Sequence, residues 1–248
     1  MGKTLEGRHA LVTGGGTGIG RAIAETLLAE GAAVTVTGRR AAPLAEVQGA
    51  YPVEMDVSDE ASVVAGIAAA RDRNGPVTIC VPNAGIAEGA TIPKTDAEMW
   101  RRIMSINLDG AFHTIRACLP DMEPWGRVIA VSSIAGLKGL KGAAAYTASK
   151  HGMIGLIRGL AADHLGRGVT FNALCPGYVD TAIIDQNVDR ISARTGMSDA
   201  DARDVMVGLN PHRRLIEVDE VAAAALWLCS DAARSVNGQA IQIAGGEY

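Results

Sequence analysis

Short runs of β-branched and other apolar residues alternate along the chain with longer stretches in which apolar residues recur every three or four positions. The short runs predict strands and the longer stretches predict helices, and this alternation is typical of βαβ units that build a parallel sheet. Several runs are continuously apolar, as expected of strands that helices cover on both faces. The predicted strands are residues 9–13, 33–37, 52–55, 77–81, 127–132, 169–175 and 240–243.

The longer stretches with a helical period lie between these strands. Ser58, Asp59 and Asp219 occupy plausible N-terminal cap positions, because their side chains can accept hydrogen bonds from the free N–H groups of a helix start. The predicted helices are residues 18–30, 59–73, 96–119, 145–165 and 218–229.

One long segment, residues 176–211, has no clear strand. It contains the sequence SDAD at 198–201, which is typical of a helix start, so we expect a small helical flap at about 178–210 rather than a disordered loop. No linker interrupts the alternation of strands and helices. We therefore expect one domain over residues 1–248.

Composition agrees with a globular α/β protein. The 248 residues include 27 acidic and 23 basic side chains, a formal net charge of −4. Apolar residues make up 48% and charged residues 20%, which is typical of globular domains and not of disordered chains. Aromatic residues are only 4% while 30 residues are glycine, so the core must be aliphatic and many close backbone approaches are expected.

Several classes of function are disfavoured. Cys80, Cys118, Cys175 and Cys229 are too widely spaced for a zinc motif, so we expect buried apolar cysteines and no metal site. Adjacent basic residues occur only as three isolated pairs, Arg39-Arg40, Arg101-Arg102 and Arg213-Arg214, in an acidic chain, which does not predict nucleic-acid binding. No apolar run approaches the ~20 residues of a membrane span, and the first residues do not resemble a signal peptide. We expect a cytoplasmic protein without membrane contact.

A glycine-rich turn, residues 14–20 (GGGTGIG), joins the first predicted strand to the first predicted helix. Such a junction directs unpaired N–H groups and the positive end of the helix dipole at one point, and the missing β-carbons let a pyrophosphate come close. The spacing is T-G-x-x-x-G-x-G, anchored by Gly14, Gly18 and Gly20, and no Lys-Ser/Thr pair follows, which excludes a P-loop. The turn predicts a dinucleotide site; the alternative is a turn that only packs the helix on the sheet.

This turn resembles the opening motif of the short-chain dehydrogenase/reductase family, and the resemblance covers nearly the whole chain. The resemblance implies an α/β single-domain doubly wound Rossmann fold, with a seven-stranded, mostly parallel sheet and helices on both faces. The other family motifs occur in order as Asn83-Ala84-Gly85 with Pro82 in place of the family's first Asn, Asn107, Ser132-Ser133, Tyr146 to Lys150 as Y-x-x-x-K, and Pro176-Gly177 with Thr181.

Tyr146 and Lys150 are four residues apart in a predicted helix, so both side chains project from one face. A phenol with a pKa of ~10 is a poor acid or base at pH 7, but a neighbouring ammonium favours the phenolate and is expected to lower the pKa of Tyr146. Ser133 follows a predicted strand, at the edge where ligands bind in open α/β sheets, and could hydrogen-bond a substrate oxygen. These residues predict proton-transfer chemistry.

The resemblance implies a role for each of these side chains. Tyr146 protonates the carbonyl oxygen as hydride arrives from the nicotinamide, and Ser133 orients that oxygen. Lys150 also holds the nicotinamide ribose, and Asn107 supports a water that relays protons to solvent. Taken alone, Asn107 could be an ordinary polar position, and His151 points to a different helix face.

The end of the second predicted strand indicates the cofactor. An acidic residue there binds the adenosine ribose of NAD and repels the 2′-phosphate of NADP. Here Gly38 takes that place and Arg39 follows, whose guanidinium can bind a 2′-phosphate, so we favour NADP(H) over NAD(H). Thr17 is a counter-indication, since many NADP-preferring relatives carry a basic residue in the glycine turn.

The predicted dinucleotide contacts combine the glycine turn, the ends of the following strands and the catalytic helix. Asp56-Val57 resembles the family's adenine-contacting pair. The full set is Gly14, Gly16, Thr17, Gly18, Ile19, Gly20, Gly38, Arg39, Arg40, Asp56, Val57, Asn83, Ala84, Gly85, Tyr146, Lys150, Pro176, Gly177, Val179 and Thr181.

The substrate is expected over the nicotinamide, in contact with Ser133, Ala135, Tyr146 and Tyr178. The length of the flap and the closing glycine-rich region are similar to polyketide ketoreductases, 3-ketoacyl reductases and 3-hydroxybutyrate dehydrogenases. The polar residues with which the last group holds a small carboxylate correspond to Ala87, Ala135 and Ala143 here. A bulkier ketone or a 3-ketoacyl thioester is therefore the better prediction.

The sequence thus predicts an oxidoreductase that transfers hydride between NADP(H) and a small-molecule ketone or secondary alcohol. One alternative is an NAD-dependent 3-hydroxyacyl or 3-hydroxybutyrate dehydrogenase. A non-enzyme alternative is a dinucleotide-binding sensor on the same fold, which would have no use for the Tyr146 and Lys150 pair. Apolar residues in the helices at 96–119 and 145–165 exceed what one sheet face needs, and by resemblance a homotetramer is expected.

Overall fold

A parallel sheet of seven strands forms the centre of the structure, which is a computed structural model and describes residues 4–247. Residues 1–3 and Tyr248 of the predicted domain lie outside the described part. The strand order is β3-β2-β1-β4-β5-β6-β7, and every neighbouring pair is parallel, so the doubly wound fold is confirmed and the sheet is wholly rather than mostly parallel. The strands are β1 (His9–Thr13), β2 (Ala33–Gly38), β3 (Tyr51–Glu54), β4 (Ile79–Val81), β5 (Gly126–Val131), β6 (Val169–Pro176) and β7 (Ala240–Ile243).

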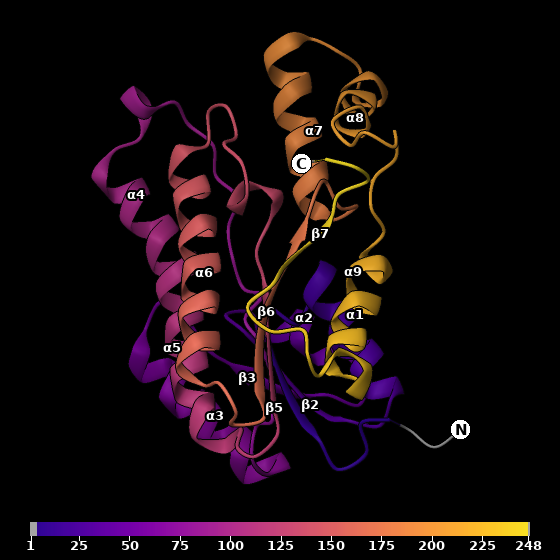
Figure 1. Cartoon of the computed structure of the whole chain (residues 1–248). Helices are drawn as coiled ribbons and strands as arrows, with labels where there is room; N and C mark the ends of the chain where they lie inside the picture. Colours follow the sequence, from indigo (N-terminus) through magenta and orange to yellow (C-terminus); the bar gives the residue numbers. More distant parts are fainter. Residues whose placement is uncertain (1–3, 248) are drawn as a thin grey trace.

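Helices cover both faces of this sheet (Figure 1). One buried cluster joins the sheet to α1, α2 and α9, and a second joins the opposite face to α3, α5 and α6. The helices are α1 (Gly18–Ala29), α2 (Ala41–Ala45), α3 (Glu60–Asn74), α4 (Ala97–Met104), α5 (Gly110–Cys118), α6 (Ala144–Asp163), α7 (Ala182–Thr195), α8 (Asp199–Val207) and α9 (Val218–Cys229).

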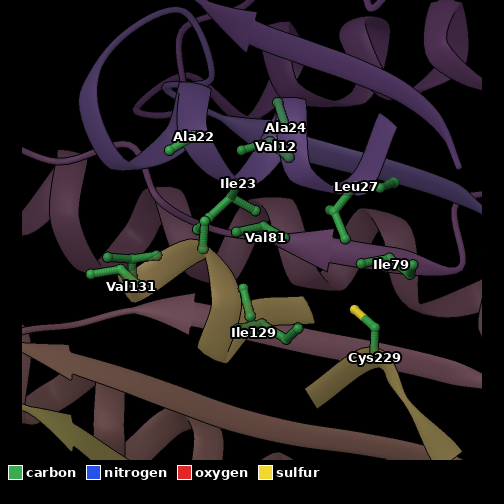
Figure 2. Packing of buried hydrophobic residues seen from close by; sticks show 14 of the residues in the cluster. Val12, Ala22, Ile23, Ala24, Leu27, Ile79, Val81, Ile129, Val131 and Cys229 are labelled. Atoms are coloured by element: carbon green, nitrogen blue, oxygen red, sulfur yellow. The ribbon is translucent and has the colours of Figure 1, made fainter. Parts of the chain in front are cut away.

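Alternation along each strand divides its side chains between the two clusters. In β4, Ile79 and Val81 pack under α1 and α9 (Figure 2), whereas Cys80 belongs to the cluster under α3, α5 and α6. All three side chains are fully buried, which explains why the strand is continuously apolar. The four cysteines are free and buried, as the sequence predicts.

The strand order creates a switch point at the centre of the sheet. The chain runs outward from β1 to β2 and β3, then returns to place β4 on the other side of β1. The loops after β1 and β4 therefore diverge to opposite faces and leave a crevice at the carboxyl edge, where ligands bind in open α/β sheets. Both the glycine-rich turn and residues 83–85 lie at this point.

The flap consists of α7 and α8, which rise away from the carboxyl edge of the sheet (Figure 1). The predicted helix start is confirmed, since the Ser198 hydroxyl accepts a hydrogen bond from the Asp201 N–H at 3.2 Å at the start of α8. The two helices share a small buried cluster that includes Ile184, Val188 and Met206. The Arg203 guanidinium anchors this flap by two hydrogen bonds to the Asp180 carboxylate at 2.7 and 2.8 Å.

Some predicted element boundaries differ from the observed ones. The helix predicted at 96–119 is interrupted by a π-helical segment, Ser105–Asp109, between α4 and α5. Asp59 is the cap of α3, as predicted, but α9 is capped by Glu217 in a capping box with Glu220, so the cap prediction for Asp219 is wrong. The short helix α2 was not expected from the sequence, because five residues carry too little periodic signal.

The amino edge of the sheet, opposite the crevice, is held by buried polar and aromatic contacts. The His9 ring donates from Nδ1 to the Gly75 carbonyl oxygen at 2.7 Å and accepts from the Thr35 hydroxyl at 2.9 Å. Next to it, the guanidinium groups of Arg8 and Arg127 lie 3.8 and 4.3 Å from the Trp125 ring centroid. Among the helices of residues 4–247, none has both the length and the apolar character needed to cross a membrane.

Candidate active site

The Asn83 side chain joins the loops that follow β1 and β4. Its carboxamide donates hydrogen bonds to the carbonyl oxygens of Thr13 at 2.8 Å and Gly14 at 3.3 Å. The backbone N–H groups of Asn83 and Ala84 donate to the Thr13 hydroxyl, each at 3.0 Å. These bonds fix the glycine-rich turn against the loop after β4, so the two sequence motifs share one corner of the crevice.

The inner side of the glycine-rich turn has no room for side chains. A Cβ atom on Gly20 would overlap the Asn83 carboxamide and the Gly14 carbonyl oxygen, and Gly14 has a φ of +63°, which favours glycine. α1 begins at Gly18 with no acidic residue in its first turn and no side-chain cap from Thr17. Its free N–H groups and positive end therefore face the turn, as pyrophosphate binding requires.

Two adjoining cavities open along this edge. The larger, about 690 Å³, reaches from the glycine-rich turn to the start of α6 and along α7, and the smaller, about 230 Å³, lies between the turn and the ends of β2 and β3. They share the residues Gly14, Thr17, Ala84, Gly85 and Ile86. Thr37 lies at the smaller cavity, and its hydroxyl is buried and has no hydrogen-bond partner within residues 4–247. The glycine cradle, the helix N-terminus and the joined cavities fit an extended dinucleotide.

Almost every residue predicted to contact the dinucleotide lines one of these cavities. Gly20 is the exception, because it packs behind the turn and acts only through its lack of a side chain. The residues on the cavity walls are Gly14, Gly16, Thr17, Gly18, Ile19, Gly38, Arg39, Arg40, Asp56, Val57, Asn83, Ala84, Gly85, Tyr146, Lys150, Pro176, Gly177, Val179 and Thr181.

A positively charged and a negatively charged side chain both line the smaller cavity. Arg39 is exposed at its wall directly after Gly38, the last residue of β2. The Asp56 carboxylate accepts hydrogen bonds from the Ser58 N–H at 3.0 Å and the Ser58 hydroxyl at 2.7 Å. The pKa of Asp56 is lowered mainly by the hydrogen bond from the Ser58 hydroxyl and also by the charge of Arg39. The end of β2 itself holds no carboxylate.

Ser133, Tyr146 and Lys150 come together in the larger cavity. Ser133 follows β5, and its side chain lies close enough to the Tyr146 phenol to affect the pKa of that phenol. The Lys150 ammonium lies 5.9 Å from the Tyr146 ring centroid and donates a hydrogen bond to the Val131 carbonyl oxygen at 2.9 Å. The strand end and the first turns of α6 therefore place a hydroxyl, a phenol and an ammonium on one cavity wall.

Burial controls the protonation of both ionisable groups. It raises the pKa of the Tyr146 phenol, and the nearby Ser133 side chain only partly opposes this. The expected lowering of the Tyr146 pKa by a nearby ammonium is therefore not what the structure shows. Burial also lowers the pKa of Lys150 to about 8, because the ammonium loses its hydration without gaining a carboxylate partner.

Asn107 lies behind the cavity wall rather than on it. It is fully buried in the π-helical segment, and its carboxamide accepts from the Ile86 N–H at 2.8 Å while donating to the Ile86 carbonyl oxygen and the Ser149 hydroxyl, both at 3.0 Å. A Cβ atom on Gly85 would lie 3.1 Å from the Asn107 carboxamide oxygen and 3.6 Å from the Lys150 nitrogen. Asn107 thus fixes the loop after β4 beside Lys150.

The predicted substrate contacts separate into two groups. Ser133, Tyr146 and Tyr178 line the larger cavity, and Tyr178 lies close enough to raise the pKa of Tyr146 slightly further. Ala135 is fully buried in a short 3-10 helix and does not reach the cavity, because its N–H turns back to bond the Ser133 hydroxyl at 3.1 Å. Ala143 and Ala87 do line the cavity, so its wall is apolar at these positions.

Several cavity residues were not identified from the sequence. Most lie on one face of α7, at a helical spacing that is visible only once the packing of the flap defines which face turns inward. These residues are Glu88, Ile183, Asn187, Arg190, Ile191 and Arg194.

Comparison with known proteins gives concordant matches. A family model described as short chain dehydrogenase matches residues 8–191. The chain is 36% identical to D-beta-hydroxybutyrate dehydrogenase of Cupriavidus necator, with 98% of each chain covered. It is 35% identical to acetoacetyl-CoA reductase of Rhizobium meliloti, over 97% of this chain and 98% of that protein. Its fold is similar to a crystal structure of actinorhodin polyketide ketoreductase with NADPH, with a TM-score of 0.92 and 31% identity over 99% of this chain and 98% of the other.

Proposed function

The chain belongs to the short-chain dehydrogenase family, and we propose that it transfers hydride between NADP(H) and the carbonyl carbon of a bulky or acyl-thioester-type 3-keto compound. Its relatives are oxidoreductases of hydroxyl and keto substrates. The observation that carries the proposal is the position of the Ser133, Tyr146 and Lys150 cluster, which faces the cavity that continues into the dinucleotide crevice.

A bound nicotinamide dinucleotide supplies the hydride to the carbonyl carbon, or accepts it in the reverse direction. The protein supplies the proton. The Ser133 and Tyr146 side chains are neighbours on the cavity wall, so one substrate oxygen can contact both hydroxyl groups. Tyr146 donates its proton to that oxygen as negative charge develops there, and the raised pKa of Tyr146 keeps the phenol protonated beforehand.

Lys150 stabilises the phenolate that remains after this transfer. Its ammonium lies 5.9 Å from the Tyr146 ring and is oriented by the Val131 carbonyl oxygen. With a pKa of about 8, Lys150 is mostly charged at pH 7, and phenolate formation strengthens that preference for the charged form. Asn107 positions the loop after β4 against Lys150 through its bonds to Ile86.

The smaller cavity supports NADP(H) as the preferred cofactor. Gly38 brings no carboxylate to repel a 2′-phosphate, and Arg39 and Arg40 line the wall beside it. The related ketoreductase structure contains NADPH. Asp56 lies in the same cavity, but its charge is balanced by Arg39 and the bonds from Ser58.

The substrate proposal rests on the larger cavity. Its walls are mainly apolar, with Ala87 and Ala143 where a small carboxylate would need polar partners. Similarity to D-beta-hydroxybutyrate dehydrogenase makes an NAD-dependent 3-hydroxybutyrate dehydrogenase the second candidate. A preference for acetoacetate with NADH would establish that candidate instead.

We also propose that the protein is cytoplasmic and assembles as a homotetramer. Trp100 on α4 and Phe112 on α5 are 41% and 43% exposed, and Trp227 on α9 is 44% exposed. Such large apolar side chains on two separate helical surfaces are typical of subunit contacts. Light scattering coupled to size-exclusion chromatography measures the assembly, and a monomer at micromolar concentration would contradict it.

The test of function follows nicotinamide absorbance with NADPH and NADH over a panel of ketones. The panel contains acetoacetate, a bulkier β-keto ester and a 3-ketoacyl thioester, and each is assayed with wild type and Tyr146→Phe. We expect NADPH-dependent turnover of the bulkier substrates and a loss of kcat of about 10²- to 10⁴-fold in the variant. Failure of every ketone to react, or full activity of Tyr146→Phe, would refute the proposal.

A further inference from the structure

The cavity-facing side of α7 ends in two arginines that the proposed chemistry does not use. Ile184 and Val188 pack the neighbouring side of the helix against α8, and Ile184 also reaches the cavity, which fixes the orientation of α7. The side that lines the larger cavity carries Ile183, Asn187, Arg190 and Arg194, at the spacing of one helix face. The wall thus changes from apolar to polar to cationic along α7.

Two other charged side chains beside this wall, Arg203 and Glu88, are already paired. Arg203 binds the Asp180 carboxylate and also lies 3.3 Å from Asp185. Glu88, the acidic residue of the cavity wall, is held by Arg102 at 2.7 Å. Within residues 4–247, neither Arg190 nor Arg194 forms an ion pair.

Arg190 and Arg194 are also a like-charged pair at positions i and i+4, which is unfavourable for an isolated helix. An anion bound between two guanidinium groups removes this repulsion and gains charge-assisted hydrogen bonds. Both side chains are exposed at the cavity wall and so remain free to reorient toward a ligand.

The pair lies far along α7 from the glycine-rich turn. Thr181, directly before α7, touches the glycine-rich turn: its methyl group lies 3.3 Å from where a Cβ of Gly18 would be. A helix rises 1.5 Å per residue, so Arg190 and Arg194 lie about 13 and about 20 Å along the helix from that contact. The carboxylate of a short 3-keto acid, in contrast, is only two bonds, or roughly 2.5 Å, from its carbonyl carbon.

We propose that Arg190 and Arg194 form an anion-binding subsite at the outer end of the substrate cavity, which selects 3-keto or 3-hydroxy compounds with an anionic group on a long tail. This inference rests on the proposed function. Two kinds of tail carry such an anionic group. One carries phosphate, as in a pantetheine-type thioester, and the other ends in a carboxylate. The apolar part of the tail lies against Ile183 and Met206, and its anionic end meets the guanidinium groups.

The test compares substrates that differ only in the anion. Acetoacetyl-CoA is paired with acetoacetyl-N-acetylcysteamine, which has the same thioester but no phosphate. A 3-keto ester with a terminal carboxylate is paired with its diester. The variants are Arg190→Gln/Arg194→Gln and a control, Arg73→Gln/Arg234→Gln, which removes the same charge from exposed positions outside the cavities.

In wild type we expect kcat/KM to be about tenfold higher for the anionic substrate than for its uncharged partner in at least one of the two pairs. The pair that shows this difference tells whether the subsite binds a phosphate or a carboxylate tail. The subsite variant should lose this ratio through KM rather than kcat, and added salt should reduce it in wild type. The control should keep the ratio. The Kd for NADPH should stay within about twofold in both variants, which excludes a cofactor phosphate as the anion.

The subsite would be overturned by the lack of any preference for an anionic member in wild type, or by an unchanged preference in the subsite variant. A preference for acetoacetate over both longer anions would also overturn it, because a short acid does not span the cavity. If no ketone reacts, the proposed function fails, and calorimetric titrations of CoA and of the 3-keto ester with a terminal carboxylate into the NADPH-loaded protein decide the subsite. If wild type and the subsite variant bind each of these two ligands with equal affinity, the subsite is refuted.

Discussion

Introducing a carboxylate at the end of β2 should reverse the cofactor preference. Gly38→Asp is the perturbation, and the structure has space for it: a Cβ on Gly38 would make an ordinary contact, 3.6 Å from the Leu44 side chain. The Gly38 φ is not positive, so the backbone accepts a side chain there. The new carboxylate would line the smaller cavity beside Arg39, in the place where a 2′-phosphate is proposed to bind.

The magnitude follows from charge and exposure. Two unit charges about 5 Å apart interact by about 3 kcal/mol at an effective dielectric constant near 20. Water at the exposed wall reduces this to about 2 kcal/mol, and pairing of Arg39 with the new carboxylate acts in the same direction. We therefore expect the ratio of kcat/KM for NADPH to that for NADH to fall roughly thirtyfold.

The assay measures that ratio with one ketone for wild type, Gly38→Asp and Gly38→Asn. The Asn variant has almost the same shape without the charge, so it should change the ratio by less than about threefold. An Asp variant that keeps the wild-type ratio would show that the end of β2 does not contact the adenosine ribose, and the assignment of Gly38 and Arg39 would be wrong. Equal effects of Asp and Asn would show that shape, not charge, makes the distinction.

Three further predictions concern stability. Burial lowers the pKa of Lys150 to about 8, so below pH 8 the ammonium is charged in both the folded and the unfolded state, and its burial destabilises the folded state. Between pH 8 and the unfolded-state pKa of 10.5, only the folded state loses the proton. The free energy of unfolding, measured by urea titration without cofactor, should therefore rise over this range by about 3 kcal/mol relative to Lys150→Met. A flat difference would contradict the burial of the charge. Because burial lowers the pKa of His9, stability should fall as the pH drops below 6.5, and His9→Gln should not show this fall. Asn83→Ala should lower the free energy of unfolding by about 1–2 kcal/mol and weaken NADPH binding, whereas Gln239→Ala, whose carboxamide bond is exposed, should do neither.

The sheet and its crevice could be predicted because the sequence signals are local. Continuous apolar runs such as residues 79–81 are readable as strands because helices bury both faces. The glycine-rich turn is readable because Gly14 and Gly20 occupy positions that exclude side chains. Ser133, Tyr146 and Lys150 are close in sequence to a strand end and a helix start, so their convergence needed little tertiary information.

The remaining features depend on contacts between residues that are far apart in the sequence, so no short stretch of sequence predicts them. The π-helical segment keeps the apolar pattern of a continuous helix, so only the bonds of Asn107 to Ile86 and Ser149 reveal it. The direction of the Tyr146 pKa shift depends on how deeply the phenol is buried, which outweighs the charge four residues away. Ala135 turns inward because the chain folds into a 3-10 helix after β5. The cavity-facing side of α7 is fixed by its contacts with α8.

The two edges of the sheet have separate tasks, and this affects how such a protein can change over evolutionary time. The His9 hydrogen bonds and the Arg8, Trp125 and Arg127 stack secure the amino edge, far along each strand from the crevice. The residues that meet the cofactor and substrate follow the carboxyl ends of the strands. Substitutions that alter substrate choice can therefore accumulate on the flap and loops without disturbing the packed core. Compensating, stabilising substitutions can arise at the amino edge. A protein whose stabilising contacts and binding residues lie at opposite edges of the sheet can change its substrate specificity and keep its fold.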